Sequence, residues 1–68
     1  MLEQYRIEFE VNVEKSYFIL TVYVNNIFRV RFSRAIDRLQ STINDLKTKY
    51  KLPDLALEDF LEQAKKYL

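Results

Sequence analysis

The chain of 68 residues contains no glycine, no cysteine and no histidine, and it has a single proline. Without cysteine and histidine it has no disulfides, and it lacks the ligands of ordinary zinc sites and the groups used in thiol and imidazole catalysis. Without glycine it cannot form the glycine-rich loops that cradle nucleotide phosphates. We therefore predict a protein that is not an enzyme and that has no cofactor, no metal and no small-molecule substrate.

Long apolar runs are also absent from the chain. Charged residues begin at the third position, no segment has the apolar core of a signal peptide, and no later run is long enough to cross a membrane. The expectation is a soluble, intracellular protein, cytoplasmic in location, with no membrane partner.

What the chain does have is a large supply of apolar side chains, with 49% hydrophobic and 15% aromatic residues. A single domain over residues 1–68 is expected, near the lower size at which one core outweighs the entropy of the chain it orders. Because neither disulfides nor metals can help, dense packing and self-association are the remaining sources of stability. We therefore expect a homodimer.

Charge is distributed unevenly along the chain, although the formal net charge is only +1. Residues 1–14 carry four Glu and one Arg, and residues 52–68 carry four carboxylates and two Lys. Residues 15–51, between them, carry eight basic residues and two Asp. The small net charge thus conceals a basic centre between two acidic ends.

Three segments have the alternation that is typical of strands. Apolar and polar residues alternate strictly over residues 5–13, which predicts a half-buried first strand. Residues 17–24 are apolar on both faces, as expected for a central strand. Residues 27–32 place Arg29 and Arg31 on one side, as at a solvent-exposed edge. The segments predict an antiparallel meander in the order 1-2-3.

The corner at residues 24–26 determines the register between the second and third strands. A two-residue Asn25-Asn26 turn would place Val22 beside Arg29, mixing core with charge. We instead predict a three-residue loop, Val24 to Asn26, with Asn26 in a left-handed conformation. The pairs expected from this loop are Val22 with Phe28, Leu20 with Val30, and Phe18 with Phe32.

Two amphipathic helices are predicted after the sheet. The first is a helix of about 17 residues with Ser33 as its N-cap, and Pro53 ends it. The second begins at Asp54 or Leu55 and buries one face, formed by Leu57, Phe60, Leu61, Ala64 and either Tyr67 or Leu68. The predicted fold is α+β, of order β-β-β-α-α, with both helices packed on one sheet face. The centre of its core is predicted at Phe9, Leu20, Phe28, Leu39, Ile43 and Phe60.

The other sheet face would carry Tyr17, Ile19, Thr21 and Tyr23 between a row of Glu and a row of Arg. Because no third layer of chain remains to cover it, this apolar patch is typical of an interaction site. In a second interpretation, Tyr and Thr simply have high strand propensity, and the Arg stems cover them.

Two functions follow from such a surface. We predict a small non-catalytic binding module, a regulatory protein that contacts nucleic acid through the Tyr/Arg sheet face and the Arg-rich strand-to-helix junction. Two Glu on the same face and the small net charge argue against it. The alternative is a protein-interaction module, acting as a symmetric dimer, adaptor or inhibitor through the same face. The residues predicted to bind either partner are Tyr17, Ile19, Tyr23, Arg29, Arg31, Arg34 and Arg38.

Overall fold

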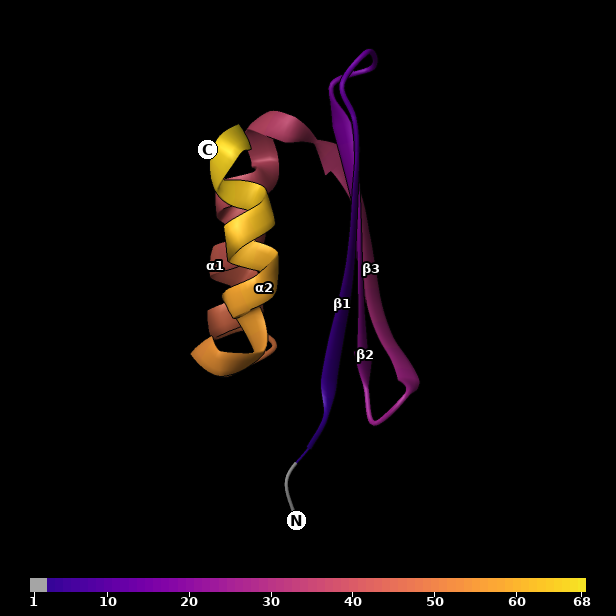
Figure 1. Cartoon of the computed structure of the whole chain (residues 1–68), viewed down its shortest axis with the longest axis vertical. Helices are drawn as coiled ribbons and strands as arrows, with labels where there is room; N and C mark the ends of the chain where they lie inside the picture. Colours follow the sequence, from indigo (N-terminus) through magenta and orange to yellow (C-terminus); the bar gives the residue numbers. More distant parts are fainter. Residues whose placement is uncertain (1–2) are drawn as a thin grey trace.

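A computed structural model describes residues 3–68 and shows a three-stranded antiparallel sheet followed by two helices (Figure 1). The strand order is β1-β2-β3. The elements in chain order are β1 (Tyr5–Asn12), β2 (Tyr17–Val24), β3 (Ile27–Ala35), a 3-10 helix (Ile36–Arg38), α1 (Leu39–Thr48), α2 (Asp54–Ala64) and a last 3-10 helix (Lys65–Tyr67). The predicted α+β fold and its order are confirmed.

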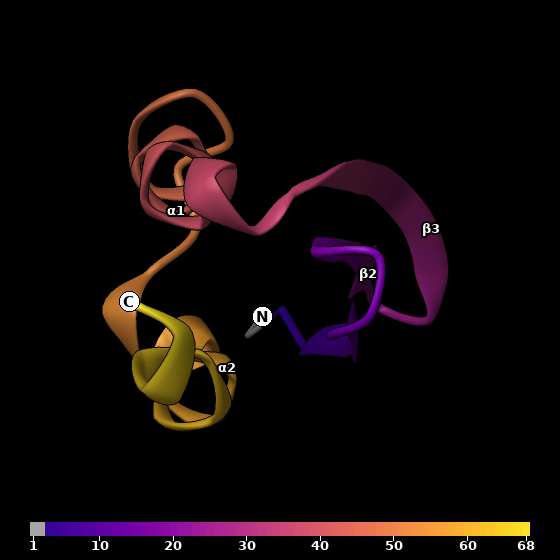
Figure 2. The same ribbon diagram turned by 90° about the horizontal axis from the view of Figure 1, so that it is seen from above.

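Both helices lie on one face of the sheet, and within residues 3–68 no element covers the opposite face (Figures 1 and 2). α2 packs against β1, and α1 packs against β3. The sheet is longer than the helical layer, so that the β1–β2 hairpin projects beyond it at one end and the β2–β3 hairpin at the other (Figure 1). The described chain measures 41 × 19 × 19 Å along its principal axes.

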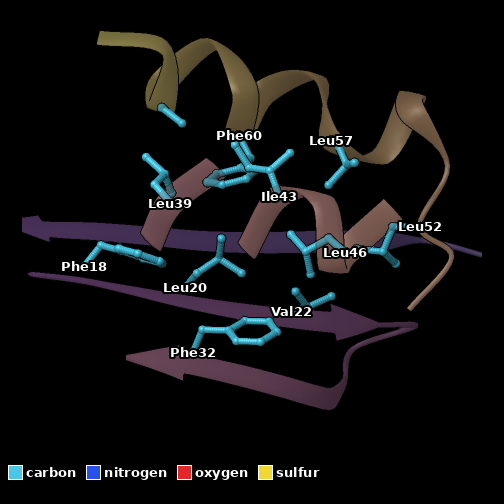
Figure 3. Close-up of a cluster of buried hydrophobic side chains, with 11 residues drawn as sticks. Phe18, Leu20, Val22, Phe32, Leu39, Ile43, Leu46, Leu52, Leu57 and Phe60 are labelled. Atoms are coloured by element: carbon cyan, nitrogen blue, oxygen red, sulfur yellow. The ribbon is translucent and has the colours of Figure 1, made fainter. Parts of the chain in front are cut away.

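The hydrophobic core lies between β2 and the two helices, as Figure 3 shows. Phe9 of β1 closes one side of it, with its ring 5.1 Å from that of Phe60 in an edge-to-face contact. The fully or nearly buried apolar residues are Phe18, Leu20, Val22, Phe32, Leu39, Ile43, Leu46, Leu52, Leu57, Phe60 and Ala64. Of the residues predicted at the core centre, Leu20, Leu39, Ile43 and Phe60 are buried there, Phe9 is half-buried at its edge, and Phe28 is 56% exposed, so its placement in the core is wrong.

The corner between β2 and β3 is a two-residue turn. Asn25 and Asn26 both have positive φ, 53° and 65°, and the flanking Val24 and Ile27 pair with each other. Two left-handed residues are what the common hairpin turn of this length requires, and Asn tolerates that conformation well. The left-handed Asn26 is confirmed, whereas the predicted three-residue loop is wrong.

With a regular strand, this two-residue turn would place Arg29 opposite Val22 on the core side, and a β-bulge in β3 prevents this. β3 holds one extra residue, around Arg29, opposite the step from Tyr23 to Val22. The extra residue restores the apolar alternation to the helix-facing side, so that Val30 and not Arg29 lies opposite Val22. Each core-face partner therefore lies two residues further along β3 than predicted. The observed pairs are Tyr23–Phe28, Val22–Val30, Leu20–Phe32 and Phe18–Arg34.

β3 is longer than predicted and the first helix is shorter. Ser33 is not a helix N-cap but a strand residue that pairs with Ile19. The Ile36 N–H donates a hydrogen bond to the Ser16 carbonyl at 3.0 Å, which holds the chain against the β1–β2 hairpin to the end of the strand. α1 begins only at Leu39 and has 10 residues. Pairing with β2 thus takes residues 33–35 out of the predicted helix.

The connection between the helices uses a left-handed residue that is not glycine. Lys51 has φ 56°, and the reversal lets the Leu52 N–H donate to the Leu46 carbonyl at 3.0 Å. α2 then begins at Asp54, directly after Pro53, as predicted. Its buried face matches the predicted one, and Tyr67 rather than Leu68 packs against the core.

The turn gives a first testable expectation. Asn26→Val should destabilise the protein by about 1 to 3 kcal/mol, because a β-branched residue strongly disfavours positive φ. Asn26→Gly should be neutral or slightly stabilising. Urea unfolding measures both, with Ser33→Val at an exposed strand position as the control. An Asn26→Val midpoint equal to that of wild type would contradict the turn geometry.

Candidate binding face

The sheet face turned away from the helices is the candidate site, and we call it the outer face. Its side chains form three parallel rows, one from each strand. Residues that are paired directly across two strands point to the same side of the sheet, and the two registers pair these residues with one another. β1 pairs with β2 along its whole length, from Tyr5 opposite Val24 to Asn12 opposite Tyr17. The outer face consists of Arg6, Glu8, Glu10 and Asn12 from β1, Tyr17, Ile19, Thr21 and Tyr23 from β2, and Phe28, Arg31, Ser33 and Ala35 from β3.

The central row is an apolar and aromatic stripe that is only partly covered. Tyr17, Ile19 and Tyr23 are half-buried, whereas Thr21 is 3% exposed. Arg31 crosses over Thr21, and its Nε donates a hydrogen bond to the Thr21 Oγ1 at 3.2 Å. The Arg stem therefore shields one residue of the stripe and leaves the two ends accessible.

An aromatic cluster lies at the end of the outer face near the β2–β3 turn. The Arg6 guanidinium sits 4.0 Å from the centre of the Tyr23 ring and forms an ion pair with Glu8. The Phe28 ring meets Tyr23 edge-on, with 6.3 Å between ring centres. Sequence reasoning missed Arg6 and Phe28 as site residues. The Asn25-Asn26 dipeptide, a strong two-residue turn signal, was the available clue for Phe28.

Charges of both signs balance on the outer face. Glu8 and Glu10 lie in the β1 row, and Arg31 lies in the β3 row, with Arg6 as the second basic group. Glu8, Glu10 and Arg31 border a shallow hollow whose floor includes Ile19 and Thr21. The middle of the face is thus a small depression between an acidic and a basic wall.

The seven residues predicted as the site do not form one surface. Tyr17, Ile19, Tyr23 and Arg31 lie together on the outer face. Arg29 lies in the bulge, at the end of the sheet where Tyr5 also lies. The pKa of Tyr5 is raised because its hydroxyl donates a hydrogen bond to the Glu3 carboxylate, and the positive charge of Arg29 partly opposes this shift.

Arg34 and Arg38 lie on the helical side of the molecule. Arg34 pairs with Phe18 in the sheet, so it faces α1. Its Nη1 donates to the Thr42 Oγ1 at 3.0 Å and lies 3.6 Å from the Asp45 Oδ2. Arg38 is exposed at the start of α1, and its carbonyl accepts a hydrogen bond from the buried Thr42. Arg34 therefore fastens β3 to α1.

Beyond the outer face, charge separates between two halves of the molecule. The half made by β3 and α1, residues 27–51, carries seven Arg or Lys and two Asp. The half made by β1 and α2, residues 3–14 and 52–68, carries eight carboxylates and three basic residues. Packing α1 on β3 and α2 on β1 turns the charge blocks of the sequence into a basic flank and an acidic flank.

Comparison of the chain with models of protein families, with curated proteins and with solved structures gave no match. Over residues 3–68, no three acidic side chains gather closely enough to hold a metal ion. None of the helices within this part of the chain is long and apolar enough to cross a membrane.

Proposed function

We propose that the protein is a non-catalytic binding module that binds a protein partner, either a second copy of this chain or a different protein, through its outer face. The observation that carries this proposal is the uncovered stripe of Tyr17, Ile19 and Tyr23 between rows of opposite charge. Protein interfaces have aromatic centres and polar rims with both charge signs. A nucleic-acid site needs a net positive surface, and Glu8 and Glu10 offset the two Arg of this face.

Site-specific photo-cross-linking tests this proposal in the cell that makes the protein. Ile19, on the outer face, and Leu55, which is 79% exposed on α2, are each replaced by p-benzoylphenylalanine. A protein adduct of discrete mass is expected from position 19 and not from position 55. Equal adduct yields at the two positions, or no protein adduct at either, would contradict the proposal. Thermal unfolding of both variants checks that the fold is retained.

Nucleic-acid binding is the second candidate, and the basic flank favours it. Arg38 and the three Lys at the end of α1, Lys47, Lys49 and Lys51, are exposed on the same half of the molecule as Arg29 and Arg31. On this hypothesis the phosphates lie along β3 and α1, and not across the outer face.

A salt titration tests the second candidate. Binding to random duplex DNA, single-stranded DNA and RNA is measured by fluorescence polarisation, and log affinity should fall linearly with log salt. Arg38→Ala should lower the slope by about one phosphate contact, and Lys66→Ala, on the acidic flank, should leave it unchanged. Absence of binding at low salt removes this candidate.

A further inference from the structure

We infer that the occupant of the outer face is a second copy of this chain, in a dimer whose two-fold axis runs parallel to β2. The inference rests on the proposed function, because it names the partner of the same face. Two observations support it: the order of the three rows across the face, and the residues of β1 and β3 that pair with the same residue of β2.

The order of the rows selects one orientation of the two copies. A two-fold axis parallel to β2 lays β2 over β2 and β1 over β3 of the second copy, which brings the acidic row onto the basic row. An axis perpendicular to the strands at the level of Thr21, in the middle of the face, lays β1 over β1 and β3 over β3, which opposes Glu8 to Glu8 and Arg31 to Arg31. Facing like charges costs several kcal/mol, so the first orientation is favoured.

The register makes the pairing specific. Glu8 and Arg31 both pair with Thr21, so they lie at the same level on either side of β2. Rotation about an axis parallel to β2 preserves that level, and Glu8 of each copy then faces Arg31 of the other. Two symmetric ion pairs result, one on each side of the apolar stripe.

The same rotation matches the aromatic end of the face to itself. Arg6 and Phe28 both pair with Tyr23, so Arg6 of one copy faces Phe28 of the other. Arg6 already lies over one aromatic ring, that of Tyr23, and Phe28 is more than half exposed. An Arg over an aromatic ring is a favourable contact, and it gains strength as water is excluded.

The size of the face sets the expected affinity. Three strands of eight residues cover about 14 by 26 Å, and sheets pack face to face about 10 Å apart. Two such faces together cover about 700 Å², which is less than the about 1,200 Å² of stable specific interfaces, so a weak and reversible dimer is expected, with a dissociation constant on the order of 10 to 100 μM.

Sedimentation equilibrium of charge-reversal variants tests the inference. Glu8→Arg places Arg opposite Arg31 of the second copy, and Arg31→Glu places Glu opposite Glu8, so each variant alone should dimerise at least about ten-fold more weakly than wild type. An equimolar mixture of the two variants restores every pair, and it should form a one-to-one dimer about as tight as wild type. The weakening of each variant together with the rescue on mixing identifies a contact between residues 8 and 31 of different copies, because a dimer that opposes residue 8 to residue 8 predicts that neither variant alone is weaker than wild type.

Matched controls carry the same charge changes on the helical layer. Glu58→Arg on α2 and Lys47→Glu on α1 are exposed and should leave dimerisation unchanged. Thermal unfolding shows whether each variant is folded, and rescue by mixing in itself requires folded partners.

Three results would overturn the inference. They are a wild type that stays monomeric to about millimolar concentration, a dimer indifferent to both reversals, and growth beyond two copies. In each case the cross-linking at position 19 still decides the proposed function separately, because an adduct with a different protein supports that function while excluding the second copy as the occupant.

Discussion

Deletion of Arg29 is expected to leave the protein folded, with a stability close to that of wild type. Arg29 is the extra residue of the bulge, and removing it leaves Tyr23 opposite Phe28 and Val22 opposite Val30 in a regular ladder. Every side chain of β3 then keeps its side of the sheet. Urea unfolding should show a cooperative transition within about 1 kcal/mol of wild type, given the ordinary size of surface effects.

Deletion of Arg31, two residues further on, is the matched control and should cost about 3 kcal/mol or more. If the bulge is kept, Phe32 moves to the outer face and leaves the core. If the bulge is lost, Phe32 stays but Arg29 comes opposite Val22 on the helix-facing side. Either outcome exposes a large apolar group or buries a charge. Equal stabilities of the two deletion variants would contradict the bulge assignment.

Leu20→Ala is expected to destabilise the protein by about 2 to 5 kcal/mol, a large share of the stability of a domain of this size. Leu20 is fully buried at the middle of β2, where Figure 3 shows it among the core side chains. Its neighbour Ile19 points to the outer face and is half-buried, so Ile19→Ala should cost less than about 1 kcal/mol in the monomer.

Chemical denaturation at low protein concentration separates these two effects from dimerisation. A Leu20→Ala loss below about 1 kcal/mol would place that side chain outside the core. An Ile19→Ala loss as large as that of Leu20→Ala would mean that the outer face is packed within the single chain.

The sequence predicted the strand order, the helix order and most of the core because those features rest on strong periodicity. The alternation from Tyr5 to Val11 and the apolar spacing from Leu39 to Leu46 each require one face to be buried. The β1–β2 pairing was predictable for the same reason, since a slip of one residue would turn Phe9 toward solvent.

The bulge was not predictable from the same pattern. Phe28, Val30 and Phe32 alternate without fault, which indicates one common face if the strand is regular. The two-residue turn at Asn25 and Asn26 sets the pairing at the start of β3 and places Phe28 on the outer face. The bulge that follows shifts the pairing by one residue, so that Val30 and Phe32 lie on the helix-facing side. Periodicity shows which residues alternate along a strand. A bulge residue moves the following side chains to the other face of the sheet, and the apolar alternation in the sequence looks the same with or without it.

The candidate site was predicted in part for a related reason. Arg29, Arg31, Arg34 and Arg38 are neighbours in the sequence, and this spacing shows a basic cluster without showing the direction of each side chain. The bulge displaced Arg29, and the longer β3 turned Arg34 toward Asp45 and Thr42. Tyr17, Ile19 and Tyr23 were placed correctly because β2 is regular over its whole length.

The projection of both hairpins beyond the helical layer has a consequence for motion. Val13 and Ile27, near the ends of the sheet, are largely exposed, whereas Leu20 is fully buried. We therefore expect backbone amides near Val13 and Ile27 to open by local fraying, and amides near Leu20 to exchange with solvent only when the whole domain unfolds. Hydrogen exchange should therefore show protection that peaks at mid-strand and falls toward both ends. If so, the outer face combines a centre at Ile19 and Thr21 that stays ordered with ends that open more easily.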